Sequence, residues 1–425
     1  MPEDAAAVDH LHRLEVIRER AWMLLAAAER GASDHFVPSS EAVGTVALAM
    51  AETVRAEARA GRPAAEPGAA EPAWTPPVAN LWLQLRRAAP AALDTLGDAL
   101  AGGDALARAK SGADLAVLHR VLEPGGLAAE DPALADLVRS FAAGAWTAGS
   151  PGTAALDAPG LRRALAGDGA VQLASSVSEL LAEPARRQRL EQLASGLEQN
   201  PAQFGSDGRF GQILAQLTTR AAAPGLPPAS GDRSSEAESG QLRAPEATSG
   251  LAAQAVVDAL APLIDPVVAS TVRIGGRLAG DVWRHPLAWA EDRSRELVPF
   301  HSLLLSLTLD LVEPLQEAGR PLADLDQLPI PASRLLAGQM LRLGLVRGRH
   351  AAIARLRHPP GSDIVVELRA LAVALADRLV DRLRAELNRN VHDLPVVLLI
   401  GPLSQAAEKW RERPGPAIAI TASSF

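Results

Sequence analysis

The chain has 425 residues, enough for two or three domains or one large one, and its net charge of −8 excludes a global basic field for nucleic acid. The absence of cysteine excludes disulfides, thiolate nucleophiles and cysteine-ligated metals, and 3% aromatic residues with no tyrosine argue against base-stacking platforms. The acidic first residues lack the apolar core of a signal peptide, and no apolar run is long enough to cross a bilayer. We therefore expect a cytoplasmic protein with no nucleic-acid or membrane partner.

Apolar residues recur at helical spacing through most of the chain and predict a mainly α fold. One stripe runs from Leu11 to Ala28, and a longer one runs from Leu368 to Leu387. Further helical patterns lie near residues 40–59, 93–109, 132–147, 185–199, 209–221 and 252–263. Strand patterns are scarce, and the best two, Val396–Ile400 and Ala417–Thr421, predict a minor β element near the C-terminus.

Two stretches are typical of linkers. Gly61–Pro77 is rich in Pro, Ala and Glu, and Ala221–Gly250 has almost no large apolar side chain. Such a segment cannot bury enough surface to offset the entropy cost of ordering it. We expect a disordered or surface linker at 221–250, between an N-terminal helical lobe (1–220) and a C-terminal helical lobe (251–425). The halves need not be independent domains, because a long loop can be inserted in one compact body.

The segment Gly280–Gly319 carries the most specific signal in the chain. It contains GDVWRH at Gly280–His285 and LVPFH at Leu297–His301, and DLD follows at Asp324–Asp326. Together with IRERAWMLLAAAERGASDHF near the start and VVELRALAVALADRL at Val365–Leu379, this ordered set resembles the uracil-catabolism protein family of bacteria and fungi, formerly a domain of unknown function. The lobe 251–425 carries the best part of this match, and the chain is identified as a divergent bacterial member.

The resemblance implies a role in pyrimidine degradation by the route in which uracil is first joined to a ribose phosphate. The implied reaction is cleavage of an N-glycosidic bond in a ribosyl-urea-like or uridine nucleotide intermediate, and the implied ligand is a small nucleotide-like or sugar-phosphate molecule. Such a reaction calls for carboxylates, arginines and stacking aromatic side chains. No cofactor and no metal are predicted.

The chain departs from the family pattern in four segments. Pro77–Leu85 keeps Trp82 but loses two His and two Arg, and Val121–Leu127 loses its aromatic residues and has Glu123 in place of Asp. Ser333–Gly338 and the helix after His301 also lose polar or aromatic residues. The positions changed are Ala79, Leu81, Leu83, Gln84, Ser302, Leu305, Ser306, Leu309 and Leu335.

A scaffold that persists while its polar site is lost favours a non-catalytic binding or scaffolding protein, which could partner an active homologue. The alternative is a divergent enzyme of the pathway. The candidate catalytic residues are His301, Asp281 and Glu367, and the candidate ligand-binding residues are Trp283, His285, Arg369 and Trp82.

His301 follows Pro299 and Phe300 at the predicted start of a helix, and with Asp310 and Glu313 on the same helix it could serve general acid–base catalysis. The alternative is a partly exposed helix whose histidine satisfies a neighbouring loop. Pro314 is expected to remove the backbone bond to the Asp310 carbonyl and to kink the helix there.

For Asp281, two interpretations stay open: it could bind a ribose hydroxyl or a cationic transition state, or it could cap a helix beginning near Val282. For Glu367 and Arg369 we favour a solvated pair over a site. His10 and His12 lie at a terminus expected to be mobile, and no metal-ligand spacing is present in the sequence.

Overall fold

The computed structural model describes residues 2–60, 76–127, 131–150, 152–167, 173–220, 250–268, 270–409 and 418–420. Helices dominate these residues and strands are few and short, which confirms the predicted mainly α fold. No described helix is both long enough and apolar enough to cross a membrane. The predicted linkers Gly61–Pro77 and Ala221–Gly250 fall outside the described residues, except for their last positions.

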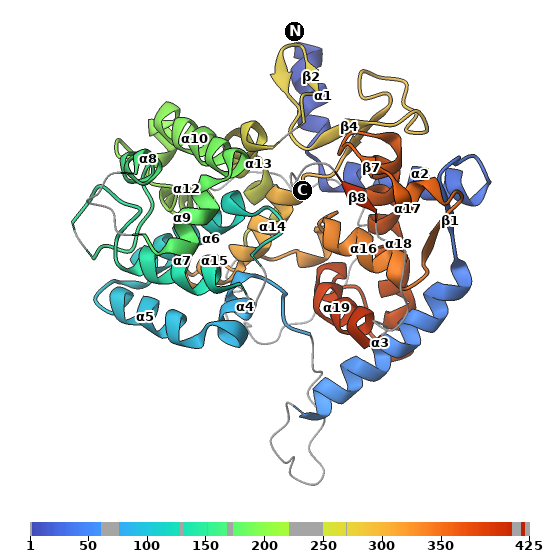
Figure 1. Ribbon diagram of the computed structural model, residues 1–425, viewed down its shortest axis with the longest axis horizontal. Coiled ribbons are helices and arrows are strands. Elements are labelled where there is room, and N and C mark those ends of the chain that lie inside the picture. The colour runs from blue at the N-terminus through green and yellow to red at the C-terminus, as the bar shows by residue number, and fades with distance from the viewer. Residues whose placement is uncertain are drawn as a thin grey trace, which may run out of the picture.

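Two helical lobes lie side by side (Figure 1). The first contains α4 (Leu81–Ala88), α5 (Pro90–Leu100), α6 (Ala105–Leu122), α7 (Pro132–Ala142), α8 (Ala158–Ala166), α9 (Ser175–Ala182), α10 (Pro184–Gln199), α11 (Pro201–Phe204), α12 (Gln212–Arg220) and α13 (Ala253–Ile264). The second contains α2 (Leu14–Glu29), α3 (Ser40–Ala60), α16 (Arg334–Arg342), α17 (Ala352–Arg355), α18 (Asp363–Leu387) and α19 (Ile400–Lys409). Between them lies α14 (Ser302–Asp310), followed by α15 (Val312–Glu317), which packs on α6.

The longest helix, α18, forms the centre of the second lobe. Most of its side chains from Val365 to Val380 are buried, which confirms the stripe predicted over Leu368–Leu387. Helices α2 and α3 pack against α18, so the first 60 residues lie with the C-terminal helices in space. The division of the chain into two lobes at 1–220 and 251–425 stays a prediction.

The strands of the described residues form four two-stranded pairs. They are β1 (Phe36–Pro38) with β6 (Val346–Gly348), β2 (Arg273–Ile274) with β3 (Arg277–Leu278), β4 (Val282–Arg284) with β5 (Leu297–Pro299), and β7 (Arg357–His358) with β8 (Ala419–Ile420). Strand β8 confirms the predicted C-terminal β element. The strand predicted at Val396–Ile400 is wrong, because Val396–Leu399 forms a 3₁₀ turn leading into α19. All four of these residues are buried, and a short apolar run does not distinguish a buried strand from a buried helical turn.

The expected interruption at Pro314 is present. Helix α14 ends at Asp310 and α15 begins at Val312. Proline has no N–H to donate to the Asp310 carbonyl, and the indole Nε1 of Trp82 donates to that oxygen instead at 2.7 Å. Trp82 therefore joins α4 to the α14–α15 junction.

Replacing Trp82 with Phe keeps an aromatic side chain but removes the indole N–H, which leaves the buried Asp310 carbonyl without this donor. We expect the free energy of unfolding to fall by about 1–3 kcal/mol, measured by urea titration. Trp289→Phe is the matched control, because Trp289 is 54% exposed and its replacement should change stability by less than about 0.5 kcal/mol. Equal effects of the two substitutions would contradict this role of Trp82.

Candidate functional site

A cavity of about 430 Å³ lies between the two lobes. Its wall comes from α4 and the segment after α6 on one side, and from α16 and α19 on the other, while α14 contributes Ser306 and Leu309. The lining is mostly apolar, small or amide-bearing. We call this space the inter-lobe cavity.

The four segments predicted to depart from the family pattern all contribute to this cavity. Pro77–Leu85 contributes Ala79, Asn80, Leu83 and Gln84; Val121–Leu127 contributes Pro124, Gly125 and Gly126; Ser333–Gly338 contributes Ser333, Leu335 and Leu336; and α14 contributes Ser306 and Leu309. Four of the positions predicted to be changed do not line it, namely Leu81, Glu123, Ser302 and Leu305. Most of the positions predicted to be changed therefore lie on one common surface.

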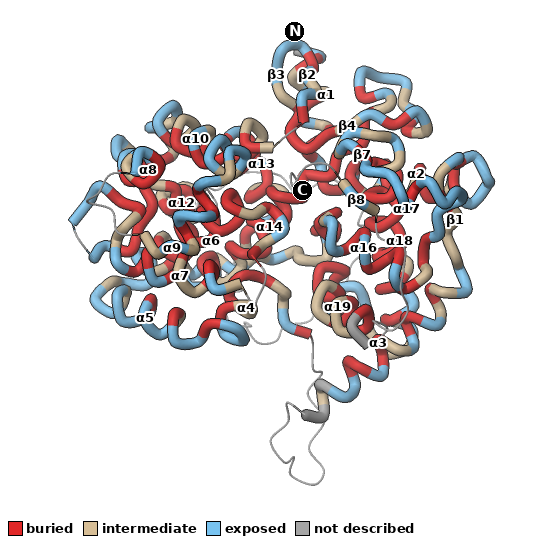
Figure 2. Tube along the Cα trace, in the orientation of Figure 1, coloured by how far each residue is buried: buried red, intermediate tan, exposed pale blue. Residues whose placement is uncertain are grey.

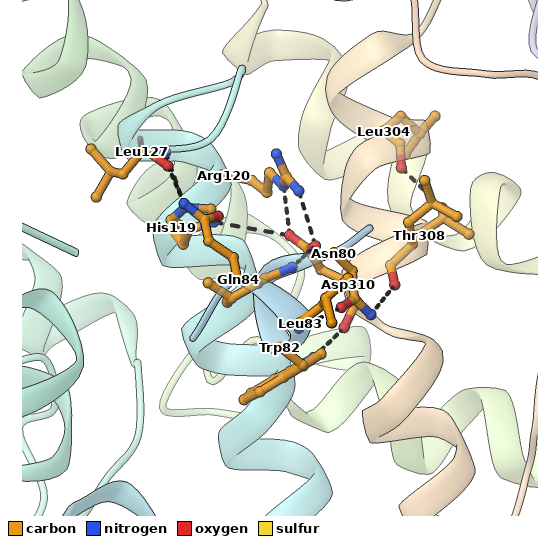
Figure 3. A network of polar contacts seen from close by, with 12 residues as sticks. Asn80, Trp82, Leu83, Gln84, His119, Arg120, Leu127, Leu304, Thr308 and Asp310 are labelled. Atoms are coloured by element: carbon orange, nitrogen blue, oxygen red, sulfur yellow. Dashed lines mark hydrogen bonds and ion pairs between the residues drawn. The ribbon is translucent and has the colours of Figure 1, made fainter. Parts of the chain in front are cut away.

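A buried ion pair lies beside the cavity, where α14 meets α6 (Figure 3). Asp310 is fully buried and accepts from Arg120 Nε at 2.5 Å, from Arg120 Nη2 at 3.0 Å and from the backbone N–H of Leu81 at 2.8 Å. The two-pronged contact fixes the plane of the guanidinium. The charge that Arg120 brings to the cavity wall is thus neutralised by Asp310.

The third nitrogen of Arg120 has a different environment. Arg120 lines the cavity, and its Nη1 has no hydrogen-bond partner among the described residues. A Cβ added at Gly126 would lie 2.9 Å from this Nη1, and the positive φ of 81° also favours glycine there. Glycine at this position therefore leaves Nη1 open as a donor to the cavity.

His119 lies beside this ion pair (Figure 3) and is not among the residues that line the cavity. Its Nε2 accepts from the Leu127 N–H at 3.2 Å, so its proton is on Nδ1, which lies 4.0 Å from Asp310 Oδ2. Burial holds the pKa of His119 well below 6.5, and the charge of Arg120 lowers it further. His119 is therefore neutral and supports the packing around Asp310.

The residue types lining the cavity limit its chemistry. No Asp, Glu, His or Lys is among its described lining residues; the charged groups are Arg87 and Arg120. An arginine stays protonated at all ordinary pH values and does not act as a general acid or base there. The described wall can donate and accept hydrogen bonds but offers no group that titrates near neutrality.

Three of the sequence-predicted site residues meet elsewhere, at the first turn of α14. Asp281 accepts from Arg369 Nη1 at 3.0 Å and Nη2 at 2.7 Å, and from Trp283 Nε1 at 2.6 Å. Its Oδ2 also accepts from the N–H of Ser302 at 3.0 Å. Arg369 lies with its Cζ 4.0 Å above the Phe300 ring and is 1% exposed. Asp281, Arg369 and Trp283 therefore form hydrogen bonds with one another.

Two sequence interpretations are corrected by this arrangement. Asp281 does cap a helix, but the helix is α14, twenty-one positions along the chain, because Val282–Arg284 forms a strand that pairs with β5. Glu367 and Arg369 are both buried and are not a solvated pair. Burial raises the pKa of Asp281, but the charge and hydrogen bonds of Arg369, with the hydrogen bonds from Ser302 and Trp283, together hold the pKa below its usual 3.8.

Glu367 and His285 form a second buried pair. Glu367 Oε1 accepts from the Ser33 hydroxyl, and Glu367 Oε2 lies 3.6 Å from His285 Nε2. His285 Nδ1 accepts from the Leu287 N–H at 3.2 Å, so Nε2 carries the proton and faces the carboxylate. Neither of these two facing atoms has a hydrogen-bond partner among the described residues.

His301 begins α14 as predicted, but the helix is buried along its whole length and is not partly exposed (Figure 2). The residue is in the left-handed region at φ 46°, and its Nε2 donates to the Leu11 carbonyl at 3.0 Å. Its ring stacks on that of His12, with centroids 4.3 Å apart, and His12 Nε2 lies 2.9 Å from Asp265 Oδ2. Burial lowers the pKa of His301 to about 4, and the adjacent His12 adds to this shift.

The seven predicted residues thus form several groups, of which those of Asp281 and His301 adjoin at the start of α14, where the Asp281 carbonyl accepts from the His301 N–H at 3.5 Å. Asp281, Trp283 and Arg369 are together, His285 and Glu367 form a pair, His301 joins His12 and Asp265, and Trp82 caps the Asp310 carbonyl. None of the seven lines the inter-lobe cavity. Their catalytic or ligand-binding roles stay predictions.

Sequence reasoning missed Arg120, Gln339, His12 and Asp265. The first two lie in segments with no recognisable motif. His12 was expected at a mobile terminus, but α1 (Pro2–Leu11) packs on β2 and β3 and leaves His12 only 6% exposed. The grouping of His12, Asp265 and His301 has no sequence signal, because their spacing along the chain is long.

Comparison with protein families assigns the chain. The model of the family described as protein of unknown function (DUF1688) matches residues 130–414, and the chain belongs to this family. The matched region includes α14, α16 and α19, whereas the cavity residues of α4 and α6 lie before it. No curated protein matches the chain.

Removing one partner of the Asp281–Arg369 pair leaves a buried charge without compensation. Arg369→Met should lower the free energy of unfolding by about 3–5 kcal/mol at pH 7, measured by urea titration. Arg162→Met is the control, because the Arg162–Glu198 pair is exposed and should contribute less than about 1 kcal/mol.

Adding Asp281→Asn to Arg369→Met removes the stranded charge and should recover part of the stability. A double variant that is no more stable than Arg369→Met would contradict this account of the pair.

Proposed function

We propose that this chain is a non-catalytic member of its family that binds a small molecule in the inter-lobe cavity. The observation that carries the proposal is the lining of that cavity, whose described residues supply hydrogen-bonding groups but no carboxylate or imidazole. General acid–base catalysis contributes about 10²–10⁴-fold to rates and needs a group that exchanges protons near neutral pH.

The ligand class follows from the open polar atoms. Gln84 and Gln339 each use their Nε2, toward the Leu127 carbonyl and the Ser404 hydroxyl, and leave Oε1 without a partner among the described residues. These oxygens accept hydrogen bonds, while Arg120 Nη1 donates one. A neutral group with adjacent N–H and C=O functions, such as a pyrimidine base or a ureide, complements this set.

A charged extension of the ligand is also accommodated. Arg87 lines the cavity and is exposed, and no ion pair engages it within the described chain. One uncompensated guanidinium suits a phosphate at the mouth of the cavity. The proposed ligand is therefore a uracil-like or ureido compound, free or carried on a ribose phosphate, in agreement with the resemblance to uracil-catabolism proteins.

Calorimetric titration with uracil and uridine 5′-monophosphate tests this proposal. We expect binding by the wild-type protein and roughly tenfold weaker binding by Gln339→Leu, because one hydrogen bond to the ligand is lost. Gln216→Leu is the control, since Gln216 is a partly exposed amide on α12, outside the cavity. Thermal unfolding of each variant checks that the fold is kept.

The enzyme alternative has its own measurement. The wild-type protein is incubated with uridine 5′-monophosphate or ribosylurea phosphate, and free base or urea is assayed. The proposal predicts no turnover above background. Turnover at about 1 s⁻¹ or faster would establish the enzyme, and absence of any binding would remove the cavity as the ligand site.

A further inference from the structure

A group of metal-ligand type lies outside the inter-lobe cavity, at the other end of α14. Its members come from three distant places: His12 between α1 and α2, Asp265 directly after α13, and His301 directly before α14. One potential ligand atom from each of the three lies within 4.8 Å of the others. Their side chains are almost entirely enclosed by the surrounding elements, with 7% of His12 and 12% of Asp265 exposed.

The hydrogen bonds of the two histidines fix where their protons are. His12 Nδ1 lies 2.9 Å from the Val8 carbonyl, and His301 Nε2 lies 3.0 Å from the Leu11 carbonyl. Since a carbonyl oxygen only accepts, both of these nitrogens carry hydrogen. The lone pairs are then on His12 Nε2 and His301 Nδ1. Histidines that bind metals characteristically donate their other N–H to a carbonyl or carboxylate in this way.

The contact between His12 and Asp265 needs a positive species between its two atoms. His12 Nε2 and Asp265 Oδ2 are 2.9 Å apart, and with the proton on Nδ1 both atoms are acceptors. A second proton on the imidazole satisfies this contact, and so does a metal ion bound by both atoms. The proton and the metal ion can be distinguished, because only a metal ion would also bind a third ligand such as His301.

The local backbone keeps space beside Asp265 and His301. His301 is held at φ 46°, a conformation uncommon for residues other than glycine, and such strained residues cluster at functional sites. Opposite it, a Cβ on Gly280 would lie 2.3 Å from Asp265 Oδ1 and 3.1 Å from His301 Cε1. The stacked rings are 22° from parallel, so a shared ion requires the His301 ring to turn, and the missing side chain at Gly280 leaves room for that turn.

The group is reachable from solvent. His12 and Asp265 both line a cavity of about 750 Å³ that also contains the carboxylate of Asp258. An ion has an entry path through this cavity, and water can fill the coordination positions that the protein leaves open.

We propose that His12, Asp265 and His301 bind one divalent transition-metal ion. Two imidazoles and one carboxylate form a mixed nitrogen and oxygen set that suits zinc and related ions better than calcium or magnesium. The ion would join the N-terminal helix to the start of α14, whose other end borders the inter-lobe cavity. This site is independent of the proposed ligand in that cavity.

The test uses the full chain without a polyhistidine tag, stripped with a chelator and titrated with Zn²⁺ at pH 7.5 by calorimetry. We expect one equivalent bound with a dissociation constant of about 1 µM or lower. Asp265→Asn and His12→Gln should each weaken binding by more than about 100-fold, because losing even an outer-shell partner typically costs 10–100-fold. Zn²⁺ should also raise the melting temperature of the wild-type protein and not that of these variants.

His350→Gln is the matched control, because His350 is an exposed histidine outside the group, and its replacement should leave binding unchanged. The two test variants remove different ligands, so a folding defect in one leaves the other to decide. The proposal is overturned if Zn²⁺ binds at this stoichiometry only in the millimolar range, or if both variants bind it as the wild type does. If a second proton on the His12 imidazole, and no metal ion, lies between His12 and Asp265, Zn²⁺ should bind only in the millimolar range.

Discussion

Helix α14 is fixed at both ends by buried carboxylates, and the arrangement of the two lobes depends on it. At its start, Asp281 accepts the N–H of Ser302 and is held by the guanidinium of Arg369 from α18. At its end, Asp310 is held by the guanidinium of Arg120 from α6. Each lobe thus contributes one arginine to the helix that lies between them. Breaking either pair would strand a buried charge, which typically costs several kcal/mol.

This arrangement explains the character of the inter-lobe cavity. The cavity lies against α14 and takes its remaining walls from both lobes, so the ion pairs that position the lobes also set its shape. Asp310 engages two nitrogens of Arg120 and leaves one toward the cavity. A buried arginine that would otherwise select an anion therefore presents a single, directed donor. Apart from Arg87 and Arg120, the described polar side chains of the wall are amides and hydroxyls, which recognise neutral ligands by hydrogen-bond pattern.

Helices with a continuous apolar stripe were predictable from the sequence, and α18 is the clearest case, because its side chains are buried over many turns. The effect of Pro314 was also predictable, since it depends only on the missing N–H. The partner that replaces that N–H, Trp82, was not, because it comes from more than two hundred positions away. The strand expected at Val396–Ile400 failed for a related reason: the burial that produces an apolar run is a tertiary property.

The candidate site was predictable in part. The segments predicted to depart from the family pattern were identified in the sequence, and in space they line one cavity. The residues expected to carry chemistry were chosen by type and by persistence of the family pattern. That choice cannot separate a catalytic carboxylate from one such as Asp281, whose polar contacts are supplied by Arg369, Trp283 and Ser302. The grouping of His12 with Asp265 and His301 depends entirely on how α1, α13 and α14 pack.

Hydrogen exchange of the full chain, with and without saturating uridine 5′-monophosphate, tests most directly whether the inter-lobe cavity is the ligand site. The account predicts slower exchange in peptides covering residues 79–87, 333–339 and 400–405, which line the cavity from both lobes. Peptides covering residues 273–285, where β2, β3 and β4 lie, should exchange at the same rate in both states. Protection confined to residues 273–285, or no protection under conditions where calorimetry shows binding, would contradict it.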